Sequence, residues 1–286
     1  MRIARNWQCY ELLDVSGGQR HENWNGYTLI RPDPTIMWGQ GICAEADAKY
    51  IRSDKGGGEW AFRRKLPESW NLKYGDLTFK VRPTGFKHTG LFPEQAVNWD
   101  FYDEIIRGAG RPISVLNLFA YTGGATLACL NAGASVCHLD AVKNMVEWAK
   151  ENAALSKLAD KPVRWMVDDA TKFLQREVKR GSRYDAIILD PPSYGRGTNG
   201  ETWKLEDCIC DLLLLCERVL SDKPLFVLMN SYTTGLSPSA VKYLMHMTLG
   251  SGGANRKITV EASEIGLPVT ATGFALPCGN TTIVRF

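Results

Sequence analysis

From residue 114 onward, apolar runs of strand length alternate with longer segments that have helical periodicity. The expected strands cover residues 114–120, 135–140, 163–169, 184–190 and 224–230. The expected helices cover residues 125–133, 142–156, 170–181 and 205–220. This alternation predicts an α/β fold in which a mostly parallel sheet is covered by helices on both faces. Right-handed crossovers make such a sheet doubly wound.

Residues 1–85 follow a different pattern. Turn signals rich in glycine, proline and asparagine separate short apolar or alternating runs, at 16–18, 23–27, 31–34 and 55–58. Such spacing predicts a small β-rich domain built of hairpins. We therefore expect two domains, an N-terminal β-rich domain at 1–85 that could recognise a substrate, and a domain at 86–286 that carries the chemistry.

The composition narrows the class of protein. The net charge of +3, from 34 basic and 31 acidic residues, allows a nucleic-acid partner without requiring one. The eight cysteines form no CxxC pair, so we expect no zinc site and a reducing compartment. No apolar signal region and no run of about 18 apolar residues occurs, which predicts a cytoplasmic protein that does not span a membrane. The oligomeric state leaves no signature in the sequence.

Acidic residues end three successive strands of the expected sheet. They are Asp140, Asp169 and Asp190, and the preceding strand ends in the turn YTGG at 121–124. Ligands of open α/β sheets bind at the carboxyl ends of the strands, so this edge is the candidate site. Glycines there let the backbone approach a ligand, although an ordinary tight turn explains them as well. The turn does not have the sequence G-x-G-x-x-G, which disfavours a nicotinamide oxidoreductase. The chain has no P-loop motif either, which disfavours a nucleoside triphosphatase.

Each acid has a binding interpretation and a structural alternative. The two oxygens of Asp140 can accept both hydroxyls of a ribose, or the residue can cap the helix that begins near 142. Asp168 and Asp169 point to opposite sides, so we assign Asp169 to an adenine amino group and Asp168 to capping; alternatively both cap. Asp190 precedes Pro191 and Pro192, whose carbonyls lie in a stiff loop without competing internal donors and could accept from a substrate. The alternative for Asp190 is a rigid turn that the acid caps.

Four stretches in this order resemble a known family. "VLNLFAYTGGAT", "HLDAVKNMVEWAKENA", "MVDDATKFL" and "IILDPPSYGRG" are similar to the successive motifs of class I S-adenosylmethionine-dependent methyltransferases. The subgroup that the chain resembles most modifies carbon five of cytosine or nitrogen seven of guanine in bacterial large-subunit ribosomal RNA. "FKHTGLFPEQAVNWDF" at 86–101 is similar to the segment that precedes the first strand in those enzymes. The resemblance implies a seven-stranded Rossmann-like methyltransferase sheet.

The same resemblance implies which residues bind S-adenosylmethionine. Residues 119–124 would surround its methionine part, Asp140 its ribose and Asp169 its adenine. The expected cofactor-binding residues are His88, Phe92, Gln95, Asn117, Phe119, Ala120, Tyr121, Thr122, Gly123, Gly124, Asp140, Ala141, Asp169, Ala170 and Asp190. The expected catalytic residues, bordering the methyl group, are Asp190, Pro191, Pro192 and Tyr194.

The sequence constrains the identity of the methyl acceptor less than that of the cofactor. Methylation of carbon five of cytosine needs a cysteine nucleophile, and the loops after the fourth and fifth strands contain none. A ring nitrogen needs positioning more than acid or base, so we expect nitrogen methylation of a base in ribosomal or other RNA. The candidate substrate-binding residues are Tyr194, Arg196, Lys204 and Tyr232.

Two further readings of the acceptor stay open. The enzyme could act on a protein or a small molecule, or the chain could bind the cofactor or RNA without turnover. Arg196 and Lys204 could equally be solvated loop charges. Arg63, Arg64 and Lys65 form the densest basic cluster, of which only two side chains share a face if the segment is a strand.

Overall fold

The protein divides into two compact units. The computed structural model describes residues 1–53, 57–196, 202–233, 235–250 and 257–286. One unit contains Met1–Arg2, Asn98–Ile265 and Cys278–Phe286, and is called the large-sheet unit below. The other contains Ile3–Val97 and Gly266–Pro277, and is called the N-terminal unit. The division therefore falls at Val97, whereas the sequence suggested residue 85, and it adds a hairpin tip that lies far away in sequence.

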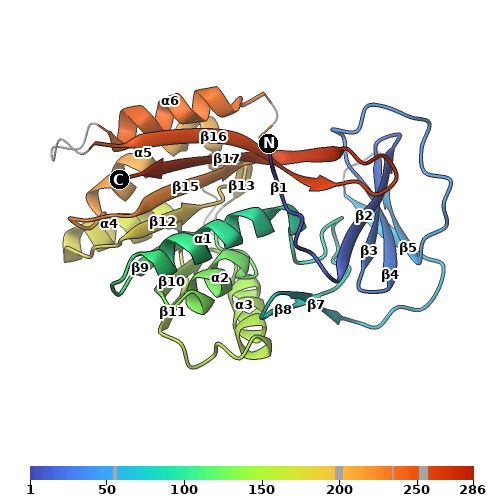
Figure 1. The fold of residues 1–286 in the computed structure, drawn as a ribbon, viewed down its shortest axis with the longest axis horizontal. Coiled ribbons are helices and arrows are strands. Elements are labelled where there is room, and N and C mark those ends of the chain that lie inside the picture. The colour runs from blue at the N-terminus through green and yellow to red at the C-terminus, as the bar shows by residue number, and fades with distance from the viewer. Residues whose placement is uncertain (54–56, 197–201, 234, 251–256) are drawn as a thin grey trace. The chain divides into compact units, whose positions relative to one another are not determined.

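The large-sheet unit is built on one eight-stranded sheet. Its strand order is β1-β16-β17-β15-β12-β9-β10-β11 (Figure 1). The bounds are β1 Arg2–Ile3, β9 Ser114–Leu118, β10 Ser135–Asp140, β11 Val163–Val167, β12 Ala186–Leu189, β15 Phe226–Ser231, β16 Thr259–Pro268 and β17 Ala275–Arg285. The strands β15, β12, β9, β10 and β11 run parallel, and β17 pairs antiparallel with β15. The expected α/β fold and mostly parallel sheet are confirmed, and the two-residue strand β1 makes an eighth strand beside the expected seven.

Helices cover both faces of this sheet. Their bounds are α1 Ala96–Gly108, α2 Gly124–Asn131, α3 Lys143–Leu155, α4 Ala170–Arg180, α5 Leu205–Arg218 and α6 Pro238–Leu249. Leu116 and Leu118 of β9 join a buried apolar cluster with residues of α4, α5 and α6. Asn117, which lies between them, contacts Thr126 of α2. Because alternate strand residues point to opposite faces, α4, α5 and α6 cover one face and α2 covers the other (Figure 1). None of the helices described here is both long and apolar enough to cross a membrane.

The order in which the chain adds strands to the sheet reverses beside β9. After β9, the chain forms β10 and then β11 on one side, and it returns to form β12 on the other side of β9. Residue registers align Leu118 with both Leu139 of β10 and Leu189 of β12. The carboxyl ends of β12, β9 and β10 therefore end level with one another at the switch point. This is the edge at which parallel sheets bind ligands.

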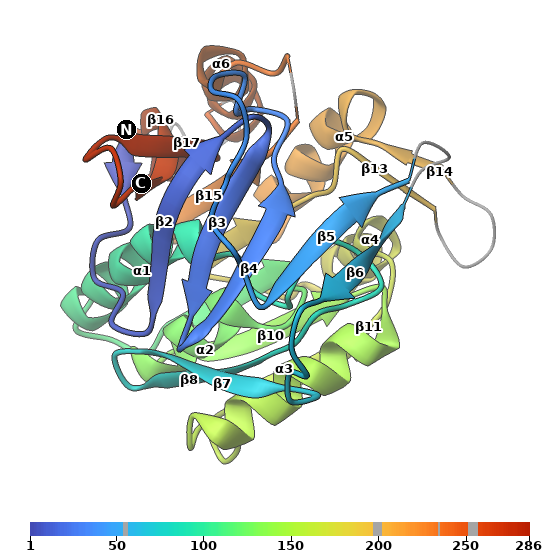
Figure 2. The same ribbon diagram turned by 90° about the vertical axis from the view of Figure 1, so that its right-hand side faces the viewer.

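The N-terminal unit is rich in strands, as the turn signals predicted. Five strands form a sheet in the order β2-β3-β4-β5-β6, which Figure 2 shows face on. Their bounds are Tyr10–Ser16, Gln19–Trp24, Tyr27–Pro32, Ala48–Arg52 and Gly58–Phe62. The hairpin of β7 (Trp70–Tyr74) and β8 (Leu77–Val81) follows, and the short 3-10 helix η1 (Pro93–Gln95) precedes α1.

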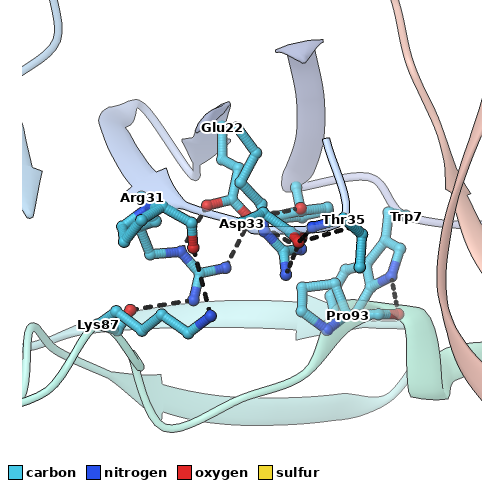
Figure 3. A network of polar contacts seen from close by, with 10 residues as sticks. Trp7, Glu22, Arg31, Asp33, Thr35, Lys87 and Pro93 are labelled. Atoms are coloured by element: carbon cyan, nitrogen blue, oxygen red, sulfur yellow. Dashed lines mark hydrogen bonds and ion pairs between the residues drawn. The ribbon is translucent and has the colours of Figure 1, made fainter. Parts of the chain in front are cut away.

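A buried ion pair lies inside this unit (Figure 3). Glu22 is fully buried and receives hydrogen bonds from Nε and Nη2 of Arg31 at 2.6 and 2.7 Å, and from the Tyr10 hydroxyl at 2.8 Å. Burial raises the pKa of Glu22, but Arg31 and Arg20 outweigh it and lower the pKa below its ordinary value. A buried carboxylate needs such partners, because an unpaired charge in the interior is costly.

Candidate functional site

The edge at the switch point collects the strand-end residues that the sequence predicted in the large-sheet unit. Asp190 follows β12, residues 119–124 follow β9, Asp140 ends β10 and Asp169 lies two residues beyond β11. These four strands are neighbours in the order β12-β9-β10-β11 and run parallel. The structure thus brings together four segments that are widely separated in sequence.

Asp140 ties the ends of two strands to each other. Its Oδ2 accepts a hydrogen bond from the backbone amide of Tyr121 at 2.8 Å, and its Oδ1 accepts one from the amide of Val142 at 2.9 Å. The N-cap of α3 is Val142, whose side chain makes no capping bond, so Asp140 is not the helix cap that was the alternative. Burial raises the pKa of Asp140, and the two amide bonds act in the opposite direction. A carboxylate has about four acceptor sites, so these two bonds leave capacity for ligand hydroxyls.

The loop after β9 has an unusual backbone. Phe119 and Tyr121 have φ values of 55° and 50°, in the left-handed region that residues with a Cβ rarely adopt. Left-handed residues other than glycine cluster at functional sites, where surrounding contacts hold them. No sequence pattern predicted this feature, because the glycines of the turn lie further along, at 123 and 124.

Both glycines of the turn have a packing role. Gly123 has a φ of 89° and caps α2, and a Cβ there would lie 3.0 Å from Cβ of Ala149. A Cβ at Gly124 would lie 2.8 Å from Cζ2 of Trp99. Close packing of helices against the turn therefore favours glycine at both positions, and at Gly123 the left-handed backbone favours it as well. The neighbouring Thr122 is buried, and its carbonyl accepts from Nδ2 of Asn152 at 2.9 Å.

Asn117 differs from the other predicted cofactor residues. Its side chain is 2% exposed and donates to Oγ1 of Thr126 at 2.9 Å, and this oxygen contacts Nδ1 of His138 at 2.9 Å. Burial lowers the pKa of His138 to about 3, so its ring is neutral at pH 7. The side chain of Asn117 thus belongs to a polar network between the sheet and α2.

The two acids after β11 divide their tasks differently from the expectation. Asp169 is the N-cap of α4, where its Oδ1 accepts from the Lys172 amide at 2.8 Å. Asp168 accepts from the Asp169 amide and forms an ion pair with Arg176. Asp169, which we assigned to adenine, is therefore also the cap, while Asp168 is held by an arginine. Among the described residues, none donates a hydrogen bond to Oδ2 of Asp169, so this oxygen can accept one from a ligand.

The loop after β12 has a protein donor that was not expected. Pro191 is buried and Pro192 is exposed, and the carbonyl of Pro192 accepts a hydrogen bond from Nε1 of Trp203 at 2.7 Å. The expectation that the proline carbonyls lack competing internal donors is wrong for Pro192. The ring of Trp203 also lies 5.3 Å from that of Phe119, at 52° between their planes. A single tryptophan in a loop gave no sequence signal for this contact.

A short hairpin follows the two prolines. It consists of β13 (Tyr194–Arg196) and β14 (Thr202–Lys204), in which Tyr194 pairs directly with Lys204. Tyr194 is 53% exposed and Lys204 is exposed, so this pair offers an aromatic ring and a positive charge together. Arg196 is in β13 opposite Thr202, but its side chain and residues 197–201 lie outside the described residues.

Tyr232 has a different environment from Tyr194. It follows β15 and is half-buried, and Gly279 of β17 lies against its ring, where a Cβ would approach Cδ1 within 2.8 Å. The loop after β12 is joined to this segment by a hydrogen bond between Oγ of Ser193 and Oγ1 of Thr233, which are 2.7 Å apart. Of the four candidate substrate residues, Tyr194 and Lys204 are thus direct neighbours, and Tyr232 follows the next strand.

His88, Phe92 and Gln95 belong to the N-terminal unit. The rings of His88 and Phe92 are 5.3 Å apart, and Gln95 is buried at the end of η1. Burial, with the nearby charges of Arg31 and Lys87, lowers the pKa of His88 to about 4. Side chains fix this backbone, since Nη1 of Arg31 donates to the Lys87 carbonyl at 3.2 Å and Nε1 of Trp7 to the Pro93 carbonyl at 2.9 Å (Figure 3).

Comparisons with known proteins agree with this geometry. Residues 34–233 match a family model described as S-adenosylmethionine-dependent methyltransferase. The match covers more than half of the chain. The chain belongs to the S-adenosylmethionine-dependent methyltransferase family. The predicted enzyme class and cofactor are therefore confirmed, and the predicted binding residues stay assignments to be tested.

Relatives add detail about fold and length. A crystal structure of a SAM-dependent methyltransferase from Agrobacterium tumefaciens has 35% identity and a TM-score of 0.92, over 99% of this chain and 92% of that one. The ribosomal RNA large subunit methyltransferase K/L of Syntrophotalea carbinolica is 27% identical over 64% of this chain and 25% of its own length. That of Pseudoalteromonas atlantica is 35% identical over 45% of this chain and 17% of its own length. The chain thus spans a quarter or less of the length of these two relatives.

The strand ends fit the cofactor of the family on their own chemistry. A ribose and an adenine need hydrogen-bond acceptors, and Asp140 and Asp169 present oxygens with remaining acceptor capacity at adjacent strands. Among the described residues, no group of three or more histidine, cysteine or acidic side chains is arranged to hold a metal ion.

Proposed function

We propose that the protein methylates a nitrogen atom of a base in RNA, at the strand ends of the large-sheet unit. The observation that carries this proposal is the pairing of Tyr194 with Lys204 in the hairpin that follows Asp190, Pro191 and Pro192. An exposed aromatic ring can stack on a base, and an adjacent lysine can neutralise a phosphate. The ribosomal RNA methyltransferases among the relatives support the same class of acceptor.

The cofactor supplies an electrophilic methyl group on a sulfonium, and transfer leaves S-adenosylhomocysteine. The residues proposed to hold it are Asp140 at the ribose, Asp169 at the adenine and the loop 119–124 at the methionine part. Asp190, Pro191 and Pro192 are proposed to border the acceptor, and they work by position because a ring nitrogen already carries a lone pair.

Nitrogen is preferred to carbon as the acceptor atom. Activation of carbon five of cytosine requires a covalent adduct with a nucleophile, usually cysteine. The sequences after β12 (190–204) and after β15 (232–237) contain no cysteine. Cys208 and Cys210 belong to α5, which begins beyond the hairpin. If the base lies in structured RNA, it must be extruded to reach the strand ends.

The test is methyl transfer to a defined RNA. Purified protein is incubated with S-adenosylmethionine that carries a deuterated methyl group and with unmodified transcripts of bacterial 16S and 23S ribosomal RNA. The RNA is then digested and its nucleosides are analysed by mass spectrometry. We expect a deuterated methyl group on a ring nitrogen in one RNA and no product with Asp190→Ala, whose folding is checked by circular dichroism.

Other products would redirect the proposal. A methyl group on carbon five of cytosine would contradict the nitrogen assignment. Label in a co-purifying protein or a small molecule, with none in RNA, would contradict the RNA acceptor. Full activity of Asp190→Ala would remove residues 190–192 from the site.

A further inference from the structure

Trp203 contacts two of the loops that end strands of the sheet. Its indole nitrogen donates to the Pro192 carbonyl in the loop after β12, at 2.7 Å. Its ring packs against Phe119 in the loop after β9, with ring centroids 5.3 Å apart. It lies in β14, so it also belongs to the hairpin that carries Tyr194 and Lys204. One side chain therefore joins three segments of the candidate site.

The indole bond matters because the proline loop has few donors of its own. Pro191 and Pro192 have no backbone N–H, so neither can donate to a carbonyl within the loop, and the Pro192 carbonyl is held by a side chain instead. The next carbonyl, that of Ser193, accepts from the amide of Leu205 at 3.1 Å. Two successive carbonyls after Pro191 are thus held by the residues that follow the hairpin turn, one by Trp203 and one by Leu205.

The contact with Phe119 matters because the backbone there is strained. Phe119 has a φ of 55°, which a bulky residue adopts only when its surroundings impose it. Phe119 and Trp203 both pack against the buried apolar cluster under α5. The Trp203 ring therefore covers one side of the residue at which the loop after β9 turns.

We propose that Trp203 is a positioning residue. It aligns the methyl acceptor, which Pro192 is proposed to border, with the loop at Phe119 that is proposed to hold the cofactor. The inference rests on the proposed function for the site, and it adds a residue that no motif indicated. Because the hairpin, the proline loop and the β9 loop share this side chain, a displacement of the hairpin is transmitted to both loops. The hydrogen bond from the indole fixes the proline loop that borders the methyl acceptor. The ring contact fixes the conformation of the loop proposed to hold the cofactor.

Two substitutions in the full chain separate these contributions. Trp203→Phe keeps a ring against Phe119 and removes the N–H donor, whereas Trp203→Leu removes both. Trp165→Phe is the matched control, because Trp165 lies on β11 with its ring against His138 and has no indole hydrogen bond within the described residues. Thermal unfolding and circular dichroism verify that each variant is folded.

The readouts are kcat with the RNA substrate and the Kd of S-adenosylhomocysteine from calorimetry. For Trp203→Phe we expect kcat to fall about tenfold or more while the Kd stays within about threefold, since small misplacement of reacting groups lowers turnover strongly. For Trp203→Leu we expect the Kd to rise about tenfold as well, from the lost aromatic contact. Trp165→Phe should match the wild type in both.

The opposite pattern overturns the inference. It fails if kcat of Trp203→Phe stays within about twofold of the wild type, or if Trp165→Phe loses as much. It also fails if Trp203→Leu is folded and binds S-adenosylhomocysteine normally; if that variant does not fold, Trp203→Phe alone decides. Should the wild type bind S-adenosylhomocysteine but modify no RNA, the RNA proposal fails, and the Kd of Trp203→Leu against that of Trp165→Phe still tests Trp203.

Discussion

The backbone amide of Tyr121 donates a 2.8 Å hydrogen bond to Oδ2 of Asp140, and this bond joins the loop after β9 to the end of β10. Tyr121 is in the left-handed region, so its amide is aimed by a backbone that few residues adopt. Asp140 thus shapes the loop that is proposed to surround the cofactor, in addition to its proposed contact with the ribose. A change at this residue tests both.

We expect Asp140→Asn to weaken the binding of S-adenosylhomocysteine at least about tenfold and to lower the free energy of unfolding by about 1–3 kcal/mol. An amide has one acceptor oxygen, so its NH2 group must face one of the two backbone N–H groups. Calorimetry gives the affinity and denaturant unfolding gives the stability. Asp160→Asn, at an exposed position, is the control and should change neither. Unchanged affinity in Asp140→Asn would argue against the ribose assignment.

Gly124→Ala tests whether the turn glycine has a packing role. The new Cβ would lie 2.8 Å from Cζ2 of Trp99, so we expect a loss of about 1–3 kcal/mol in unfolding free energy. Gly108→Ala is the control, because Gly108 lies in α1 and a Cβ there meets no atom within 4 Å. That variant should be as stable as the wild type or more stable by up to about 1 kcal/mol. Equal stability of Gly124→Ala and the wild type would show that Trp99 can shift without cost.

The exposed pair on the hairpin should contribute to RNA binding in two different ways. Tyr194→Ala should weaken RNA binding by about 1–3 kcal/mol through lost stacking. Lys204→Gln should weaken RNA binding. It should also reduce the slope of log K against log salt concentration by about one, as expected for the loss of one phosphate contact. Both are measured by fluorescence anisotropy over a salt series, with Lys161→Gln at an exposed site of the same unit as the control. A salt dependence identical in Lys204→Gln and Lys161→Gln would assign Lys204 to the solvated surface.

The buried His138 predicts how stability depends on pH. Burial lowers its pKa from 6.5 to about 3, so between these values the unfolded chain binds a proton that the folded chain does not. The contribution of neutral His138 is thus fully present above pH 6.5 and is lost as the pH falls toward 3, by about 1.4 kcal/mol per pH unit. We expect His138→Leu to have a smaller loss of unfolding free energy between pH 7 and pH 4.5 than the wild type. Parallel curves for the two proteins would contradict a depressed pKa.

The sequence determined the arrangement of elements and the line of acids. Alternating apolar runs and helical segments require a parallel sheet covered on both faces, because each strand must bury both of its sides. The position of an acid directly after each run then places Asp140, Asp169 and Asp190 at one edge, since parallel strands end together. These inferences use only period and order, which are local properties of the chain.

Tertiary structure decided how those residues are used. That Asn117 lies in a buried network with Thr126 depends on which helix packs on which face. The contact of Trp203 with Pro192 and Phe119 joins residues that are far apart in sequence, and an indole can donate to any carbonyl that packing brings near. Likewise, glycine at 124 is favoured by the ring of Trp99 from another helix, which a Cβ there would approach within 2.8 Å. Such contacts arise only when the elements are assembled, so no pattern along the chain could predict them.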